Sequence, residues 1–559
     1  MVNQILLYNA KVYLYPGEFA EAVLIRGSRI SAVGTRADLS DSTDVSCHEI
    51  DCGGRTIVPG FNDSHMHLME FGENMRQAPV HKAESVEDII RICTAFAEEN
   101  PEAVRHGLHS AGWNQDHFPD HRIPDRKDLD RISTDYPIVL ERVCGHIACA
   151  NTAAIRMLGL TAESPQYPDG RFFFGEDGEP NGIFAGNACL YVRKLIPEFT
   201  PDEKLDILEE SMKYAVSKGL TSVQSNDVGA MSGTSEDNFA LFQRLYDEGC
   251  GLIRYRHQVN FETLDDFRRC IESGEYAKAG NAVIASPSKD HLDPPLLTLG
   301  PLKLYKDGSL GARTAYLKDG YLKDPENHGL QWQSQEDLLA FCRLAAKNGI
   351  QVVTHCIGDA AIEQVADCYI QCNAEFNASK NPLRHGLVHC QITDRDLLRK
   401  IADNDLLTLV QPVFLNADIP ILKDLIRPEL AASSYAFGTL IHSCGNRVSL
   451  GTDCPVEDCD PFQNIYSAVT RKRLSTNASN DSFHPEECLT VEEAVDAYTI
   501  GSAYAMFMEH ELGRIHPGFL ADLVLLDTDI FTCPVEDIKK TRPLLTMVSG
   551  NVVYSALEE

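Results

Sequence analysis

The stretch GFNDSHMH, residues 60–67, decides the fold, because it reads as a short buried strand that ends in two histidines. Seven further short apolar segments follow it, and each precedes a helix-like stretch: LTSVQS (220–225), LIRYRHQV (252–259), LKLYKDG (302–308), QVVTHC (351–356), GLVHC (386–390), LLTLVQP (406–412) and RVSLGTD (447–453). Strands that alternate with helices are typical of a parallel sheet. Eight of them predict an α/β protein built on a (β/α)8 barrel of the TIM type.

The spacing of these segments predicts a large insertion after the first strand. About 150 residues separate the first segment from the second, far more than one helix and its loops need. We therefore place an insertion at about residues 70–205, within a barrel domain that spans residues 60–509. The insertion contains an apolar strand of its own, PIVLERVCGH at 137–146.

The two ends of the chain read as short β-strands around glycine-containing turns. Residues 1–59 include ILLYNAKVYLY and AVLIRGSRISAVG, and residues 510–559 include GRIHPGFLADLVLLD and LLTMVSGNVVY. Neither end is long enough to bury a good core alone, so we expect the two to pack together. The prediction is a small composite β-sandwich domain made from both termini.

The composition excludes several classes of function. The 559 residues include 82 acidic and 50 basic side chains, and the formal net charge of −32 repels nucleic acid and anionic membranes. The sequence MVNQILLYNAKVYLYPGE lacks a basic region followed by a long apolar run, and no stretch approaches the roughly 18 apolar residues of a membrane span. The 18 cysteines are scattered irregularly, unlike a secreted disulfide framework. We expect a cytoplasmic protein that binds neither nucleic acid nor membrane.

Ionisable residues gather at the predicted strand ends. His65 and His67 are two positions apart on one strand, so both imidazoles point to the same side and can chelate. A lone histidine is more often an ordinary buried or surface residue. Here, however, four more candidates fall at the C-terminal ends of other strands, where barrel enzymes keep their sites: Lys303, His355, His389 and Asp453. Burying so many ionisable groups together is costly unless a metal ion compensates.

The ordered series of motifs resembles the amidohydrolase superfamily, specifically its type 3 branch, which includes YtcJ-like proteins and N-substituted formamide deformylases. The resemblance covers nearly the whole chain. It rests on six segments: VPGFNDSHMHL (58–68), LKLYKDGSLGARTAYL (302–317), THCIGDAAI (354–362), RHGLVHCQ (384–391), LGTDCPVED (450–458) and HELGRIHPGFLADLVLLD (510–527).

The resemblance implies a site for a divalent metal, expected to be Zn²⁺, with one or two ions per chain. It assigns the ligands residue by residue: His65 and His67 to one metal, His355 and His389 to a second, Lys303 as a bridge when carboxylated by CO2, and Asp453 as a further ligand and proton shuttle. A free lysine is a poor ligand, whereas its carbamate is an anionic bridge with two oxygens. Lys306, three positions from Lys303, falls on the opposite face of the strand and is expected to be structural.

The implied reaction is hydrolysis of a C–N bond other than a peptide bond, in a small amide or formamide-like substrate. A metal-activated hydroxide would attack the polarised carbonyl, and Asp453 would return the proton to the leaving nitrogen. Candidate substrate contacts are Asp307 and Arg313 in the loop DGSLGART, and His146 and Trp113 in the insertion. Asp307 and Arg313 could instead pair as a salt bridge that orders the loop, and His146 and Trp113 could be core residues of the insertion.

Two other functions remain open at this stage. One is a non-catalytic regulator or sensor that keeps the ligands on the same scaffold, and the other is a mononuclear hydrolase or deaminase with an unmodified Lys303. Because one barrel supports many reactions, similarity of fold does not choose among them. A homodimer is expected only as the commonest oligomeric state.

Overall fold

The computed structural model describes residues 4–142, 146–167, 170–274, 294–376, 380–474 and 481–557. The chain divides into two compact units. The first unit consists of Met1–Met69 and Leu208–Glu559, and it holds both the barrel and the strands from the two ends of the chain. The second unit, Glu70–Ile207, is the segment inserted after the first barrel strand.

Eight parallel strands form the barrel, and they match the eight segments identified in the sequence. The strands run in the order β20-β19-β18-β17-β16-β15-β14-β8, so strands that are consecutive around the sheet are also consecutive along the barrel sequence. Their bounds are β8 (Phe61–Met66), β14 (Leu220–Ser225), β15 (Arg254–Val259), β16 (Leu297–Tyr305), β17 (Val352–Cys356), β18 (Gly386–His389), β19 (Leu407–Val410) and β20 (Val448–Leu450). The predicted (β/α)8 barrel is confirmed.

The first and last strands meet just beyond the end of β20. The backbone N–H of Asp453 donates to the carbonyl of His65 at 2.8 Å, and the N–H of His67 donates to the carbonyl of Cys454 at 2.7 Å. These bonds bring two potential metal-binding segments, at opposite ends of the barrel sequence, next to each other.

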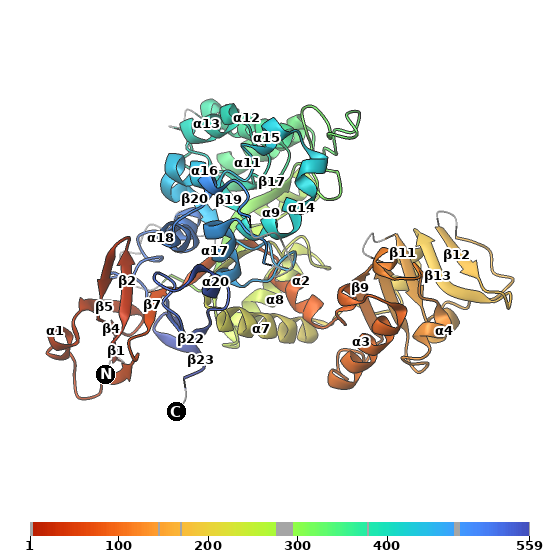
Figure 1. The fold of residues 1–559 in the computed structure, drawn as a ribbon, viewed down its shortest axis with the longest axis horizontal. Helices are drawn as coiled ribbons and strands as arrows, with labels where there is room; N and C mark the ends of the chain where they lie inside the picture. The colour runs from red at the N-terminus through yellow and green to blue at the C-terminus, as the bar shows by residue number, and fades with distance from the viewer. Residues whose placement is uncertain are drawn as a thin grey trace. The chain divides into compact units, whose positions relative to one another are not determined.

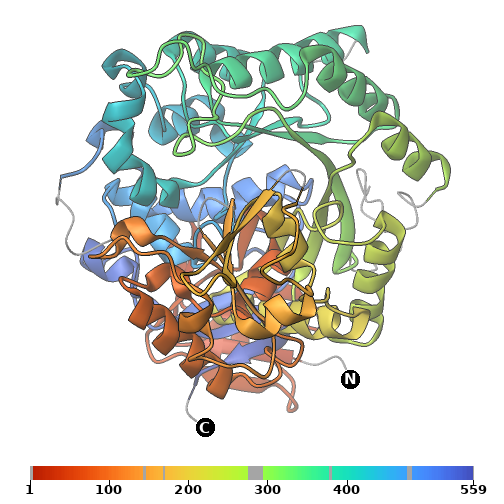
Figure 2. The same cartoon turned by 90° about the vertical axis from the view of Figure 1, so that its right-hand side faces the viewer.

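Helices cover the outside of the barrel strands, as Figure 2 shows for the green to teal helices of residues 335–403. Each helix turns an apolar face to the sheet, and several begin at a Ser, Thr or Asp whose side chain accepts a backbone N–H in the first turn. The main barrel helices are α8 (Ser235–Asp247), α9 (Leu264–Glu272), α11 (Gln335–Lys347), α12 (Asp359–Glu375), α13 (Arg395–Asp403), α16 (Phe437–Cys444) and α17 (Pro461–Thr470).

The two ends of the chain build one β domain, as the sequence predicted. One of its sheets, β23-β22-β21-β7-β2-β3, joins C-terminal to N-terminal strands, and β21 pairs antiparallel with β7. The other, β5-β4-β1-β6, is wholly N-terminal (Figure 1). The strands are β1 (Gln4–Tyr8), β2 (Lys11–Tyr15), β3 (Glu18–Ala20), β4 (Ala22–Arg26), β5 (Arg29–Gly34), β6 (His48–Asp51), β7 (Thr56–Pro59), β21 (Leu523–Leu526), β22 (Pro543–Val548) and β23 (Asn551–Ser555). A shared apolar core, which includes Leu7, Val12, Leu523 and Met547, explains why neither end needs to fold alone.

The inserted unit has a mixed five-stranded sheet in the order β12-β13-β11-β10-β9. The strands are β9 (Leu108–Trp113), β10 (Ile138–Arg142), β11 (Ile147–Ala150), β12 (Gly170–Phe174) and β13 (Pro180–Gly186). Helix α3 (Val86–Glu99) packs five buried apolar side chains into the core on this sheet. The unit therefore has a hydrophobic core of its own.

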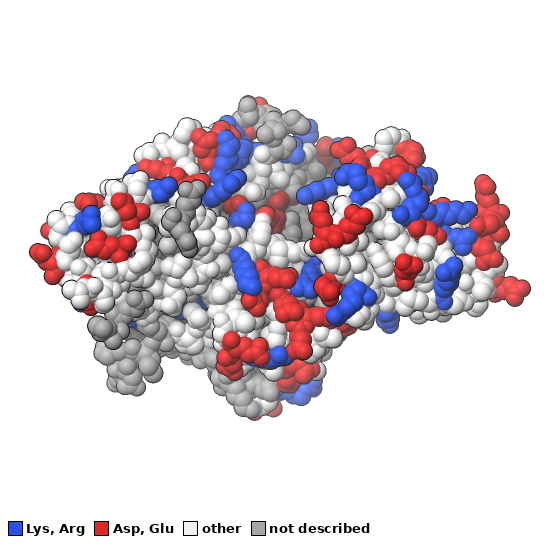
Figure 3. All heavy atoms as spheres, turned by 90° about the horizontal axis from the view of Figure 1, so that it is seen from below, with Lys and Arg blue, Asp and Glu red and all other residues white. Residues whose placement is uncertain are grey.

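The surface carries mixed charge. On the face seen in Figure 3, acidic side chains are interspersed with lysines and arginines. Among the described residues, no helix has both the length and the apolar character needed to cross a membrane.

A buried ion pair ties the barrel to the β domain. Arg254, the first residue of β15, donates through Nε to Asp522 Oδ2 at 2.8 Å, and the two side chains are 2% and 3% exposed. Asp522 also accepts the backbone N–H of Ser549 at 2.7 Å. Breaking a buried pair leaves one charge without compensation in a poorly solvated position.

We therefore expect Asp522→Asn to destabilise the protein by about 3–5 kcal/mol, because Arg254 would keep its charge without a counterion. Chemical denaturation monitored by circular dichroism measures the loss. The control is Glu49→Gln, which breaks the exposed pair with Arg36 and should leave the unfolding midpoint nearly unchanged. An equal effect of the two substitutions would contradict the assigned role of the buried pair.

Candidate metal centre

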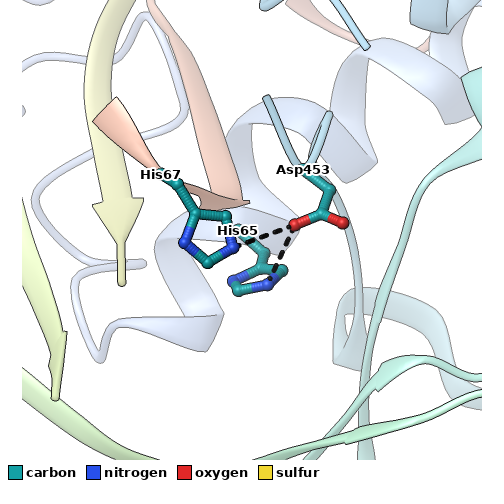
Figure 4. A group of neighbouring side chains, drawn as sticks. All are labelled: His65, His67 and Asp453. Carbon is teal, nitrogen blue, oxygen red and sulfur yellow. Dashed lines mark ion pairs between the residues drawn. The ribbon is translucent and has the colours of Figure 1, made fainter. Parts of the chain in front are cut away.

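Three predicted ligands converge at the C-terminal end of the barrel. His65 and His67 lie at the end of β8, and Asp453 follows β20 (Figure 4). Asp453 Oδ1 is 3.2 Å from His65 Nε2 and 3.3 Å from His67 Nε2. One ligand atom from each of the three residues lies within 4.8 Å of the others, so a single cation can contact all three.

The other three predicted ligands adjoin this group. Lys303 Nζ is 2.9 Å from His65 Nε2. The ring of His389 lies 5.6 Å from that of His65 and 4.5 Å from that of His355, measured between centroids. The structure thus brings all six predicted ligands together at one end of the barrel.

Burial controls the protonation of these groups. It lowers the pKa of His65 to about 4 and of His355 to about 3, in each case with help from the nearby charge of Lys303, and it lowers the pKa of His389 well below its usual value. Burial also lowers the pKa of Lys303 to about 7. These three imidazoles are therefore neutral at pH 7, the form in which histidine binds metals.

The directions of the pKa shifts of Asp453 and His67 depend on their mutual contact, because the two side chains face each other. Burial by itself raises the pKa of Asp453, but contact with His65 and His67 lowers it well below its usual range. Burial lowers the pKa of His67, but the Asp453 carboxylate more than offsets that effect and the pKa is raised. Asp453 is thus a carboxylate at neutral pH.

Glutamine side chains fix which nitrogen of two histidines faces the site. Gln258 donates through Nε2 to the carbonyl of Ser64 at 2.9 Å, so its Oε1 must face His65 Nδ1, 2.6 Å away. Gln411 donates in the same way to the carbonyl of Leu409, and its Oε1 lies 2.8 Å from His389 Nδ1. An amide oxygen accepts and cannot donate, so each Nδ1 carries the proton and each Nε2 keeps its lone pair.

Backbone carbonyls orient the other two histidines. His67 Nδ1 lies 2.9 Å from the carbonyl of Asn226, so its Nε2 faces Asp453. His355 is reversed: its Nε2 lies 3.2 Å from the carbonyl of Gly308, which leaves Nδ1 as the ring's lone-pair atom. A carbonyl accepts only, so it fixes the tautomer of the neutral ring directly.

The resulting arrangement favours a positive charge next to Asp453. Asp453 Oδ1 is buried and receives no hydrogen bond, and the lone pair of the neutral His65 ring faces both this oxygen, 3.2 Å away, and Lys303 Nζ, 2.9 Å away. Converging lone pairs on oxygen and nitrogen, together with neutral imidazoles and a carboxylate, form the donor set that a borderline cation such as Zn²⁺ prefers. The residues present therefore fit a divalent metal.

The four predicted substrate contacts lie in different settings. Asp307 is buried, and its carboxylate accepts the backbone N–H groups of Tyr316, Ile357 and Gly358, so it holds the loop after β16 against the end of β17. Arg313 is exposed and has a left-handed backbone with φ 55°. No ion pair joins these two residues in the described part of the chain, so the loop is not ordered by the salt bridge considered as an alternative. In the inserted unit, Trp113 is fully buried in the core and His146 is exposed.

Three residues of the site were missed from the sequence: Asn226, Gln258 and Gln411. Each follows or ends a barrel strand that supplies none of the predicted ligands, namely β14, β15 and β19. A signal existed, because each is a polar residue at the C-terminal end of a predicted strand. With them, every one of the eight strands contributes at least one group to the metal centre.

Comparisons with known proteins agree with this geometry. A sequence model of the amidohydrolase family matches residues 48–554, which include all eight barrel strands. The chain is 29% identical to the putative amidohydrolase YtcJ of Bacillus subtilis over 97% of each chain, and 24% identical to N-substituted formamide deformylase of Arthrobacter pascens over 96% of this chain and 95% of the relative. A solved structure of an uncharacterized metal-dependent hydrolase from Pyrococcus furiosus superposes with a TM-score of 0.74 at 25% identity, over 95% of this chain and 100% of the other.

The glutamine contacts predict a change in metal affinity. Gln258→Leu and Gln411→Leu should each weaken binding of Zn²⁺ about tenfold to a hundredfold, because the histidine they orient loses its fixed tautomer. Competition with a chromogenic chelator measures the affinity. Gln258→Glu and Gln411→Glu keep an oxygen opposite Nδ1 and should restore most of it.

Gln351→Leu provides the matched control. Gln351 is also a buried glutamine of the barrel, but it precedes β17 and donates to the carbonyls of Arg384 and Ala505. Its loss should reduce stability without a comparable change in metal affinity. If all three leucine variants weakened metal binding equally, the orienting role of Gln258 and Gln411 would be wrong.

Proposed function

This chain belongs to the amidohydrolase family, as its motifs indicated, and we propose that it hydrolyses a C–N bond other than a peptide bond in a small molecule, using a divalent metal. The observation that carries the proposal is the convergence of Asp453 Oδ1 with His65 Nε2 and His67 Nε2 at the end of a barrel, beside three further predicted ligands. The names of two relatives, an amidohydrolase and a formamide deformylase, favour amides and formamides as the substrate class.

The metal site would use the six residues in two groups. His65, His67 and Asp453 would hold one ion, and His355 and His389 would hold a second beside it, with Lys303 between the groups. A metal bound here acts as a Lewis acid on the carbonyl and lowers the pKa of water. We propose zinc, because nitrogen and oxygen donors from histidine and aspartate suit it.

Lys303 would serve as a bridge in its carboxylated form. Its neutral Nζ forms a bond to the carbon of CO2 and loses a proton, and the product is an anionic carbamate with two oxygens. Burial favours the neutral amine, which is the reactive form, and Lys303 is only 1% exposed. The carbamate would replace a buried amine with an anion at a place where cations are to be held.

Asp453 would move the proton during the reaction. Its carboxylate lies beside both histidines of the first group and stays ionised at neutral pH, so it can accept a proton from the attacking water. It can then pass that proton to the nitrogen of the leaving amine, which otherwise departs as a strongly basic anion. The rigid backbone bond from Asp453 N–H to the His65 carbonyl keeps the carboxylate at a fixed position.

Metal content tests the number of ions and the role of Lys303. Protein purified without chelators and supplied with bicarbonate should contain about two zinc ions per chain. Lys303→Met should lower the content toward one ion or none, and wild-type protein given ¹³C-labelled bicarbonate should show a carbamate carbon signal that the variant lacks. A content near one would favour the mononuclear alternative, and no metal after reconstitution would refute the metal mechanism.

Lys306→Met is the matched control for Lys303. Lys306 is also buried, but its Nζ donates to the Gln331 side chain at 3.2 Å and to the Gln333 carbonyl at 2.7 Å. This variant should keep both the metal content and the carbamate signal.

If Asp453 transfers the proton, the effect of its substitution on kcat should depend on the leaving group. At equal metal loading, Asp453→Asn should lower kcat on alkyl formamides by about 10²–10⁴-fold, since no acid protonates the departing nitrogen. Anilides with a nitro group in the ring have leaving groups that need less protonation, so the substitution should lower kcat on these substrates by a smaller factor. Equal losses on both substrates, measured by amine release, would show that Asp453 acts only as a ligand.

A further inference from the structure

An exposed aromatic side chain lies next to the metal centre without a role in the proposed reaction. Trp332 is 61% exposed, the largest apolar side chain in the loop between β16 and α11. Its ring lies 5.9 Å from that of Tyr305, the last residue of β16, with the two planes tilted by 33°. An exposed tryptophan of this kind is costly in water and is often part of a binding surface.

Tyr305 connects Trp332 to the ligands. The Tyr305 ring lies 4.6 Å from Lys303 Nζ and 5.9 Å from the ring of His355, and its hydroxyl donates to the side chain of Asn226. Tyr305 is two positions from Lys303 on the same strand, so the two side chains share a face. A chain of contacts therefore leads from Lys303, the predicted bridging ligand, through the Tyr305 ring to the Trp332 ring at the surface.

Contacts of the loop with Lys306 hold Trp332 beside the end of β16. The backbone N–H of Trp332 donates to the carbonyl of Lys306, which fixes the loop alongside the end of β16. The flanking residues bind Lys306 Nζ, Gln331 through its side chain and Gln333 through its backbone carbonyl. The Trp332 ring itself meets Tyr305, which lies on the same face of β16 as Lys303.

We propose that Tyr305 and Trp332 form a subsite for a flat aromatic substituent of the substrate amide. This inference rests on the proposed function, because it assigns the substrate class of the same site. When the reacting carbonyl lies near Lys303, a substituent that extends from it toward the surface meets Tyr305 first and then the exposed face of Trp332. A planar ring can stack on both, whereas a short alkyl group makes little contact with either.

The two tryptophans of the chain make a direct test possible. Trp113 is fully buried in the inserted unit, so Trp332 alone has an emission that responds to a ligand covering its face. Benzamide and acetanilide, which place the aromatic ring on either side of the amide, should shift the fluorescence of the zinc-loaded full chain to shorter wavelength. Acetamide at the same concentration should not, and the shift should disappear in Trp332→Phe.

Affinity measured by calorimetry gives the second readout. Trp332→Ala should weaken binding of the aryl amides about twofold to tenfold, the range expected for one lost stacking contact, and leave acetamide binding unchanged. Trp332→Phe keeps an aromatic face and should retain most of the affinity. Leu330→Ala is the matched control, since Leu330 is 52% exposed in the same loop and its backbone N–H is bonded to Thr314.

The outcomes distinguish a failure of the proposed subsite from a failure of the proposed function. If aryl amides bind with the expected dependence on Trp332 but are not hydrolysed, the subsite stands and the proposed function fails. If amides are hydrolysed and Trp332→Ala leaves the preference for aryl over alkyl substrates unchanged, the subsite is refuted. A fluorescence shift that persists in Trp332→Phe would also refute it, because the signal would then come from Trp113.

Discussion

The site depends on one electrostatic constraint: a buried carboxylate oxygen without a hydrogen bond lies beside a neutral imidazole whose lone pair is shared with the amine of Lys303. Asp453 Oδ1 receives no hydrogen bond, and His65 points the lone pair of Nε2 toward it because its other nitrogen is committed to Gln258. A buried carboxylate without compensation is strongly unfavourable. Folding therefore leaves this unfavourable contact in place, and a bound cation would turn it into a favourable one.

The parallel barrel makes such a convergence possible. All eight strands end on one side, so a residue near the C-terminal end of each strand comes close to the others whatever its distance in the sequence. His65 and Asp453 are neighbours for this reason, and the backbone bonds between their segments connect the first strand to the last. The strands that carry no ligand supply the orienting groups Asn226, Gln258 and Gln411. The orienting groups thus come from strands other than those of the histidines that they hold, so each of these contacts ties two parts of the barrel together.

The sequence was sufficient for the barrel and for the meeting of the six predicted ligands at one end of it, because both leave local signals: short apolar segments at regular positions, and ionisable residues at their ends. It also predicted that the chain ends pack together, since neither could bury a core alone. It was not sufficient for Gln258 and Gln411, because a polar residue at a strand end is only a weak signal, and the role of each glutamine depends on which histidine lies near it in the barrel. Trp332 was equally hidden, because its position beside Tyr305 depends on a backbone hydrogen bond between the loop and Lys306. Asp307 looked like a substrate contact by position, while in the structure its carboxylate binds three backbone N–H groups.

Strand β15 shows how stability and function are divided along one element. Its first residue, Arg254, is bound to Asp522 of the β domain, and Gln258, four residues later, orients His65 at the opposite end of the strand. The N-terminal end of a barrel strand thus serves the scaffold and the C-terminal end serves the site. Since Gln258 can hold the histidine only if the strand itself is fixed, the buried ion pair with the β domain also limits how far the site can relax. The composite domain, which supplies none of the predicted ligands, therefore contributes to the geometry of the site through the strand that it anchors.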